Sequence, residues 1–152
     1  MDTAKVFDEV TKNFERGLGR YDPAVVQAIW SAPTPVDEAR ARIEAMAGPS
    51  GFMLFSATDH GALVSLFATE PKKAIQYVFG HPLIALEMTR HNLAAGLYVP
   101  LRLLIYEHDG KTTRLEYDRP SSILGQFDDA RIRSVAAALD HKVEALVGQA
   151  IG

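Results

Sequence analysis

The 152-residue sequence contains no cysteine. This absence excludes disulfide bonds, thiolate metal ligands and cysteine nucleophiles. A chain of this length buries about two-thirds of the surface that it exposes when unfolded, so its core requires no disulfide or metal support. The absence of cysteine also fits a reducing compartment, and we expect a cytoplasmic location.

Long apolar runs are missing as well. The longest, such as GALVSLFA and VPLRLLIY, are far shorter than the roughly 20 residues that span a bilayer, and Arg102 interrupts the second. The first residues, MDTAKVFDEVTKNFERG, are amphipathic and charged, unlike the apolar centre of a signal peptide. We therefore expect neither membrane association nor export.

An excess of positive charge is the third missing feature. The formal net charge is −3 at pH 7, and no stripe of lysine and arginine is interleaved with aromatic residues. Proteins that bind a phosphate backbone depend on such a stripe. The sequence therefore predicts no nucleic-acid partner.

What is present is the composition of an ordinary globular protein, with 47% hydrophobic and 23% charged residues. Apolar residues at helical spacing predict helices over 3–18, 36–47, 82–91 and 128–147. In the helix at 36–47 the residues expected to face inward are Val36, Ala39, Ile43 and Met46. Residues 22–31 carry signals of both helix and strand, so their type stays open.

Strands are predicted by a buried apolar run at 52–58 and by alternation at 74–79. Two further segments, 100–107 and 112–117, flank an Asp-Gly turn at 109–110 and predict a β-hairpin. We expect these strands to form the sheet of a single compact α+β domain. The helices at 36–47, 82–91 and 128–147 are expected to cover that sheet.

Four stretches in this order resemble the domain of unknown function 302 family of bacterial and archaeal proteins: GFMLFSATDH, YVFGHPLIALEM, LYVPLRLLIYE and YDRPSS. The resemblance implies an α+β domain with an antiparallel sheet of about four to five strands over residues 36–152. It leaves residues 1–35 as a helical or irregular extension. It also implies a homodimer, and it implies no established activity. The chain also has more large apolar side chains than one small sheet readily covers, which favours a dimer too. They are Trp30, Phe52, Phe55, Phe67 and Phe79.

One position departs from the family pattern. His81 stands before Pro82 where the family usually has asparagine, which is a good helix N-cap. Histidine caps less well. The substitution therefore either weakens the cap or adds a ligand.

The helix that starts at Pro82 presents polar groups among apolar ones. Glu87 and His91 share an arc of roughly 140° with Leu83, Ile84 and Met88. Burial of the two polar side chains without partners would cost several kcal/mol. We therefore expect Arg102 or His60 to bond Glu87 across the helix–sheet interface.

Six polar residues are candidates for one small-molecule site, because a carboxylate can orient an imidazole and an arginine can hold an anion. They are Asp59, His60, His81, Glu87, His91 and Arg102. The structural alternative is that Asp59 caps a turn, His60 bonds a carbonyl and Arg102 pairs with Glu87. If a ligand site exists, His60, His81 and Arg102 should line one concave pocket.

A second hypothesis is a metal site. Glu87 and His91 are spaced i, i+4, so both can reach one ion with His81 or His60 as a third ligand. The motif lacks the H-E-x-x-H pair of metalloproteases, and such pairs also occur on ordinary helix surfaces. The sequence names no cofactor or substrate, and it leaves three functions open: a small-ligand protein, a metal protein, and a dimeric partner-binding module.

Overall fold

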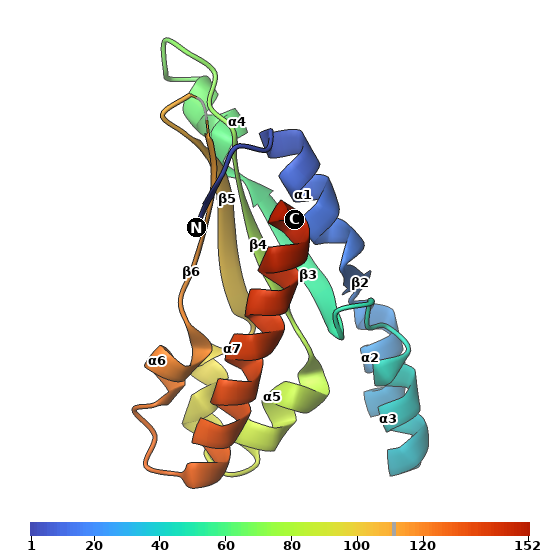
Figure 1. Ribbon diagram of the computed structural model, residues 1–152. Coiled ribbons are helices and arrows are strands. Elements are labelled where there is room, and N and C mark those ends of the chain that lie inside the picture. The colour runs from blue at the N-terminus through green and yellow to red at the C-terminus, as the bar shows by residue number, and fades with distance from the viewer. Residues whose placement is uncertain (111) are drawn as a thin grey trace.

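The computed structural model describes residues 1–110 and 112–152. The elements follow one another as β1 (Asp2–Thr3), α1 (Phe7–Arg16), β2 (Leu18–Arg20), α2 (Pro23–Ser31), α3 (Val36–Glu44), β3 (Phe52–Asp59), α4 (His60–Ser65), β4 (Ala74–Gly80), α5 (Pro82–Thr89), the 3₁₀ helix η1 (Leu93–Tyr98), β5 (Leu101–His108), β6 (Thr112–Tyr117), α6 (Pro120–Leu124) and α7 (Ala130–Ile151) (Figure 1). None of the helices in the described residues is both long and apolar enough to cross a bilayer.

The sheet has six strands in the order β1-β6-β5-β4-β3-β2. All neighbours are antiparallel except β2 and β3, which are parallel. The α+β class and the four strands expected from the sequence are confirmed, but the expectation of a purely antiparallel sheet with four to five strands is wrong. The two additional strands, β1 and β2, are only two and three residues long, too short to show an alternating pattern.

Residues 1–35 contribute directly to this sheet and its core. Asp2 and Thr3 pair with β6, and Leu18–Arg20 pair with β3. Phe7, Val10 and Phe14 of α1 are buried. The N-terminal segment is therefore built into the α+β unit through β1, α1 and β2.

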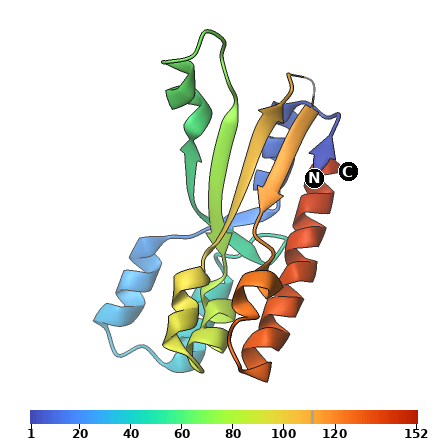
Figure 2. The same cartoon turned by 90° about the vertical axis from the view of Figure 1, so that its left-hand side faces the viewer.

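Helices α1 and α7 cover one face of the sheet and pack against each other (Figure 1). Phe14 lies at the centre of this layer, with its ring centroid 5.0 Å from that of Tyr77 and 5.5 Å from that of Phe79. The apolar stripe predicted for the last helix faces the same core: Ile132, Ala136, Leu139, Val143 and Leu146 are buried, and Val135 is partly buried. Figure 2 shows that α2 and α4 lie at opposite ends of the molecule, on the side away from α7.

Helix α3 does not cover the sheet, contrary to expectation. None of its residues is buried, and Val36, expected to face inward, is 75% exposed. The helix packs on α2 and α5 instead. Residues 22–31, whose type the sequence leaves open, form helix α2, because Asp22 Oδ1 accepts a hydrogen bond from the Ala24 N–H at 2.8 Å and Pro23 occupies the first turn.

Strand β2 reaches the sheet through a close backbone approach. A Cβ atom added to Gly19 would lie 1.9 Å from the Met46 carbonyl oxygen and 2.5 Å from the Gly48 nitrogen. Real Cβ atoms do not approach backbone so closely, and backbone cannot move aside as a flexible side chain can. Only glycine at position 19 therefore allows β2 to pass the segment that follows α3.

We expect Gly19→Ala to lower the free energy of unfolding by about 2–3 kcal/mol, the upper part of the range for an overpacked core substitution. The matched control is Gly148→Ala on α7, where an added Cβ meets nothing within 4 Å. That change should raise the free energy of unfolding by up to about 1 kcal/mol, because alanine favours a helix over glycine. Urea denaturation measures both. Equal effects of the two substitutions would contradict the close approach.

Tyr77 carries a polar group into the core. Its ring is fully buried on β4, and its hydroxyl donates to Glu15 Oε1 on α1 at 2.7 Å. Burial raises the pKa of the Tyr77 hydroxyl well above its usual range, and the hydrogen bond to Glu15 raises it further. The folded protein therefore keeps this proton at alkaline pH values at which the unfolded chain releases it.

Above a pH of about 10, the ordinary tyrosine pKa, the unfolded state binds fewer protons than the folded state, so stability falls as pH rises. We expect Tyr77→Phe to be less stable than wild type by about 1 kcal/mol at pH 8, because it lacks one hydrogen bond. This difference in stability should shrink by about 1 kcal/mol at pH 11. At that pH the unfolded wild type gains stability by releasing the Tyr77 proton, and the variant has no such proton to release. A difference independent of pH in urea titrations would refute the assignment.

Candidate functional site

The end of β3 carries two of the residues predicted to form a site. Asp59 Oδ1 accepts a hydrogen bond from the Ala62 N–H at 2.8 Å and so caps α4. His60 is the first residue of that helix and is exposed. Asp59 therefore has the structural role predicted as the alternative to ligand binding, that of a carboxylate that closes a turn.

His81 lies between β4 and α5 and is 7% exposed. Its Nδ1 accepts a hydrogen bond from the Leu83 N–H at 3.2 Å, which makes His81 the N-cap of α5. Because Nδ1 is an acceptor, the neutral ring carries its proton on Nε2, which lies 3.3 Å from Glu44 Oε2. Both ring nitrogens are thus engaged, one with the start of α5 and the other with the end of α3.

Glu87 lies on α5, which packs beyond the end of the sheet against α7, α3 and η1. The predicted helix 82–91 ends at Thr89, so His91 lies in the turn after it. Glu87 Oε2 lies 3.6 Å from Arg90 Nη1, in an exposed pair one helical turn apart. The prediction that Arg102 or His60 bonds Glu87 is therefore wrong. Arg102 is exposed between the buried Leu101 and Leu103 on β5, so it points to the uncovered side of the sheet.

No group of three or more histidine, aspartate or glutamate side chains positioned to hold a metal ion occurs among residues 1–110 and 112–152. Of the three residues predicted as metal ligands, His81, Glu87 and His91, two contact other groups. His81 bonds Leu83 and Glu44, and Glu87 pairs with Arg90. Among the described residues the structure therefore brings no third ligand to Glu87 and His91, and His91 itself lies beyond the end of α5.

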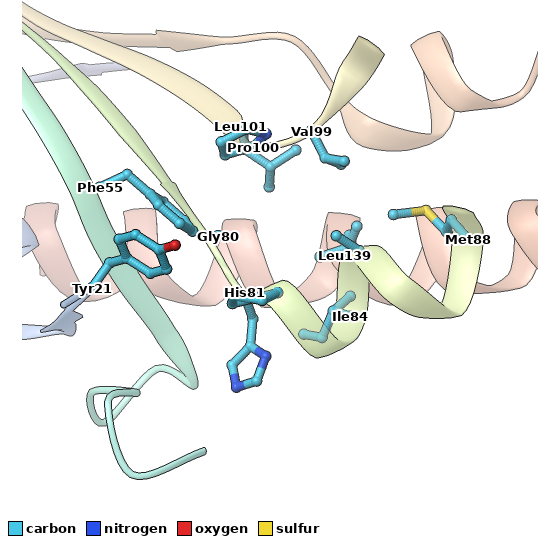
Figure 3. Close-up of a pocket in the computed structure, with 12 residues that line it drawn as sticks. Tyr21, Phe55, Gly80, His81, Ile84, Met88, Val99, Pro100, Leu101 and Leu139 are labelled. Carbon is cyan, nitrogen blue, oxygen red and sulfur yellow. The ribbon is translucent and has the colours of Figure 1, made fainter. Parts of the chain in front are cut away.

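An apolar cavity of about 220 Å³ lies where β4 turns into α5. Figure 3 shows Tyr21 beside Phe55 on one side of this space, Ile84 and Met88 of α5 on another, and the His81 ring pointing away from it. The Tyr21 and Phe55 ring centroids are 4.6 Å apart. The lining consists of Tyr21, Phe55, Gly80, His81, Pro82, Ile84, Ala85, Met88, Val99, Pro100, Leu101 and Leu139.

A second, more polar cavity of about 480 Å³ adjoins the first, and we call it the charged hollow. The two cavities share His81, Ile84 and Leu139 as lining residues. The charged side chains of the hollow are Arg40, Glu44, Glu87 and Lys142.

Both carboxylates of the charged hollow have partners, since Glu44 contacts His81 and Glu87 contacts Arg90. Arg40 and Lys142 have no carboxylate within 4.0 Å in the described part of the chain. Lys142 Nζ instead lies over the Phe52 ring, 5.1 Å from its centroid. The hollow therefore presents two cations that form no ion pair within the described residues, together with the Glu44 carboxylate, whose contact is to the His81 imidazole.

Arg102 lines a different hollow, of about 790 Å³, with Gln76, Glu116, Tyr117 and Asp118 among its neighbours. His60 lines none of the three cavities described here. The structure therefore does not bring His60, His81 and Arg102 into one concave pocket. Of the six predicted residues, His81 and Glu87 share the charged hollow.

Sequence reasoning missed Tyr21, Arg40 and Lys142, which reach the two cavities from three separate segments. It also missed Asp140, a buried acid on α7 that accepts hydrogen bonds from the Ser121 N–H at 2.9 Å and the Ser121 hydroxyl at 2.5 Å. Arg119 Nε lies 3.2 Å from the same carboxylate. The position of Asp140 directly after the apolar Leu139 of α7 could have indicated a buried acid. In the structure Asp140 holds α6 against α7.

Comparison with solved structures identifies the same architecture elsewhere. A crystal structure described as an uncharacterized conserved protein DUF302 from Bacillus stearothermophilus matches with a TM-score of 0.66 and 15% sequence identity. The match covers 99% of this chain and 94% of that chain. At this identity the likeness shows the fold alone.

A comparison with curated proteins gives no match. The family model for the domain of unknown function DUF302 matches residues 29–150, which is most of the chain. The segments quoted above for the resemblance all lie inside that range. The chain therefore belongs to the DUF302 family.

Proposed function

We propose that this protein binds a small molecule with an apolar body and an anionic group. The body would occupy the apolar cavity, and the anionic group would lie in the charged hollow. The observation that carries this proposal is the shared wall of the two cavities, formed by His81, Ile84 and Leu139. One ligand lying along these shared residues, with its ends in the two cavities, would meet apolar side chains at one end and the cations Arg40 and Lys142 at the other.

The dimensions favour a ligand of modest size. Pockets for drug-sized molecules measure about 300–1,000 Å³, while a dry cavity of about 150 Å³ holds benzene. The apolar cavity, at about 220 Å³, falls between these values. A single substituted ring or a short alkyl chain matches that volume.

The polarity favours an anion over a neutral or cationic molecule. Arg40 contributes a planar guanidinium that can hold a carboxylate or phosphate through two parallel hydrogen bonds, and Lys142 contributes a second positive charge. Arg40 thereby takes the role that the sequence assigns to Arg102, whose hollow is a separate one.

We propose binding without a catalytic step. A general base needs a free lone pair near the substrate, and the two nitrogens of His81 already face Leu83 and Glu44. The imidazole instead fixes α5 to α3, which keeps the wall between the two cavities in place.

The test uses three molecules that share one body and differ in charge: 3-phenylpropanoate, 3-phenylpropanol and 3-phenylpropylamine. We expect the carboxylate to bind at least about tenfold more tightly than the amine, which corresponds to about 1.4 kcal/mol. Arg40→Glu should remove that preference, because it reverses a charge in the hollow. Titrations followed by two-dimensional NMR of the labelled protein measure the affinities and report the resonances that move.

The matched control is Arg42→Glu on the same helix, because Arg42 pairs with Glu38 at 3.9 Å and does not line either cavity. Ala85→Leu tests the apolar end, since a larger side chain there takes up part of the cavity. Equal binding of all three molecules, or binding unchanged by Ala85→Leu, would show that this site is not the one used.

The structural role of His81 gives a separate prediction. His81→Ala should lower the free energy of unfolding by about 1 kcal/mol, because the N-cap of α5 is lost, while His81→Asn should cost less, because asparagine caps well. Thermal unfolding with and without Zn²⁺ distinguishes the capping role of His81 from a role as a metal ligand. A zinc-dependent stabilisation of wild type that His81→Asn abolishes would identify His81 as a ligand and overturn the assignment of its nitrogens.

A further inference from the structure

The side of the sheet away from α1 and α7, which we call the open face, carries the hollow of about 790 Å³ that the proposed function does not use. We call it the open-face hollow. Its lining includes Gln76 of β4, Arg102 and Leu104 of β5, Glu116 of β6, and Asp118 directly after β6. These three strands lie side by side in the sheet (Figure 2). Strand register therefore determines how the lining residues are arranged.

The register places a positive and a negative side chain next to each other in this hollow. Leu103 pairs with Tyr117, so the same register extended by one residue sets Asp118 opposite Arg102. Residues at opposite positions of neighbouring strands have Cβ atoms about 4.5–5.5 Å apart. Nevertheless, within residues 1–110 and 112–152, neither the Arg102 guanidinium nor the Asp118 carboxylate forms an ion pair within 4.0 Å. Both charges remain available to a ligand.

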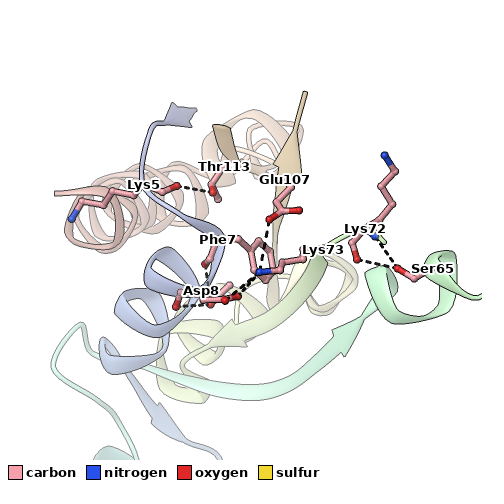
Figure 4. Close-up of polar contacts among 9 residues, drawn as sticks. Lys5, Phe7, Asp8, Ser65, Lys72, Lys73, Glu107 and Thr113 are labelled. Carbon is pink, nitrogen blue, oxygen red and sulfur yellow. Dashed lines mark hydrogen bonds and ion pairs between the residues drawn. The ribbon is translucent and has the colours of Figure 1, made fainter. Parts of the chain in front are cut away.

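The other acidic and arginine side chains of β5 and β6 do have partners. Glu116 Oε1 lies 3.8 Å from Arg114 Nη1 on the same strand. Near the other end of β5, Glu107 Oε1 lies 3.8 Å from Lys73 Nζ (Figure 4). The two charges at the open-face hollow are therefore an exception on this part of the sheet.

The edge of the hollow is held in place by β1. Arg114 donates two hydrogen bonds to the Asp2 carboxylate, the one from Nη2 at 2.8 Å, which ties β1 to β6. The Thr113 hydroxyl donates to the Lys5 carbonyl at 2.8 Å (Figure 4). Met1, which lines the hollow, precedes these two anchored residues of the N-terminal segment. The hollow is therefore built on paired strands rather than on a loop.

We propose that the open-face hollow binds a free α-amino acid with an aliphatic side chain. Arg102 would hold the carboxylate of the amino acid through two parallel hydrogen bonds, and Asp118 would accept hydrogen bonds from its ammonium group. Leu104 would contact the aliphatic side chain, since it lies two residues from Arg102 on the same face of β5. Gln76, which pairs with Leu104, adds an amide at the edge of this contact.

The neighbouring opposite charges favour a zwitterion over a simple ion. An anion bound to Arg102 would lie close to the Asp118 carboxylate and be repelled by it, and a cation bound to Asp118 would likewise be repelled by Arg102. An α-amino acid carries its ammonium and its carboxylate on one carbon atom, so it can satisfy both side chains at once. The end of a peptide carries only one of these two charges.

This site is separate from that of the proposed function. The open-face hollow shares no lining residue with the apolar cavity or with the charged hollow. Substitutions in one site can therefore be made without altering the lining of the other.

The test compares leucine with two relatives that have the same side chain. N-acetylleucine lacks the ammonium group, and leucinamide lacks the carboxylate. At pH 6.5 the amine of leucinamide is charged, because α-amino groups titrate near about 7.7–8.0. In titrations to about 10 mM, followed by two-dimensional NMR of the labelled protein, we expect leucine to bind at least about tenfold more tightly than either relative. The resonances that move should be those of residues around Leu104.

Two substitutions assign the two charges. Arg102→Gln should abolish the preference for leucine over leucinamide, because the carboxylate loses its partner. Asp118→Asn should abolish the preference for leucine over N-acetylleucine. The matched controls are Arg133→Gln and Asp128→Asn, which remove the same charges from a pair 3.3 Å apart outside the hollow. Both controls should bind leucine as wild type does.

Three results would overturn this inference. They are the absence of leucine binding up to about 10 mM, equal binding of leucine and N-acetylleucine, which indicates recognition of a carboxylate alone, and unchanged binding of leucine by Arg102→Gln. Arg40→Glu separates the two sites, because it should remove the preference for 3-phenylpropanoate and leave leucine binding unchanged. Leucine binding lost in Arg40→Glu but kept in Arg102→Gln would place the amino acid in the charged hollow and refute the site on the open face.

Discussion

The fold depends on the burial of one face of the sheet beneath α1 and α7. Phe14 of α1 lies against Tyr77 and Phe79 of β4, and the buried stripe of α7 covers the same strands. The other α-helices lie at the two ends of the sheet, with α4 at one end and α2, α3, α5 and α6 at the other (Figures 1 and 2). Large apolar side chains that this core does not use remain exposed at those ends, among them Phe67 after α4 and Trp30 on α2.

The junction at His81 links this core to the candidate site. The imidazole caps α5 through Nδ1 and reaches Glu44 of α3 through Nε2, so two helices that lie beyond the sheet are tied to the end of β4. The position requires an acceptor for the start of α5 and a donor for Glu44, and the neutral imidazole of His81 provides both on one ring. Asparagine could cap the helix but is too short to bridge to α3 in the same way. The departure from the family pattern therefore has a structural explanation in the contact with Glu44.

The sequence predicts those parts of the structure that depend on local patterns. The strands at 74–79 and 112–117 and the helix at 128–147 follow from periodicity and turn residues, and all are confirmed. The short strand β2 and its parallel pairing with β3 depend instead on the close approach of Gly19 to residue 48, which no local pattern records. The assignment of the inward face of α3 failed for a related reason, since amphipathic spacing does not tell which element lies opposite.

The candidate site was harder to predict, because its residues come from segments far apart in the chain. His81 attracted attention through its unusual place before a proline, and the structure gives it a central position. Arg102 has the chemistry expected of an anion site, but strand alternation turns it to the open face. Arg40 has the same chemistry on an exposed helix, where a cation is the rule, so nothing in the sequence distinguishes it.

Leu63, Val64, Leu66 and Phe67, on α4 and in the turn after it, stay exposed, so the fold gains little from them. A residue such as Phe67, at 87% exposure, leaves most of its apolar surface in water, so folding recovers little of the free energy that burial would provide. The hydrogen bonds of Asp59 and Ser65 nevertheless hold it there. The conformation of this segment is therefore set by its polar contacts rather than by burial of its four apolar side chains.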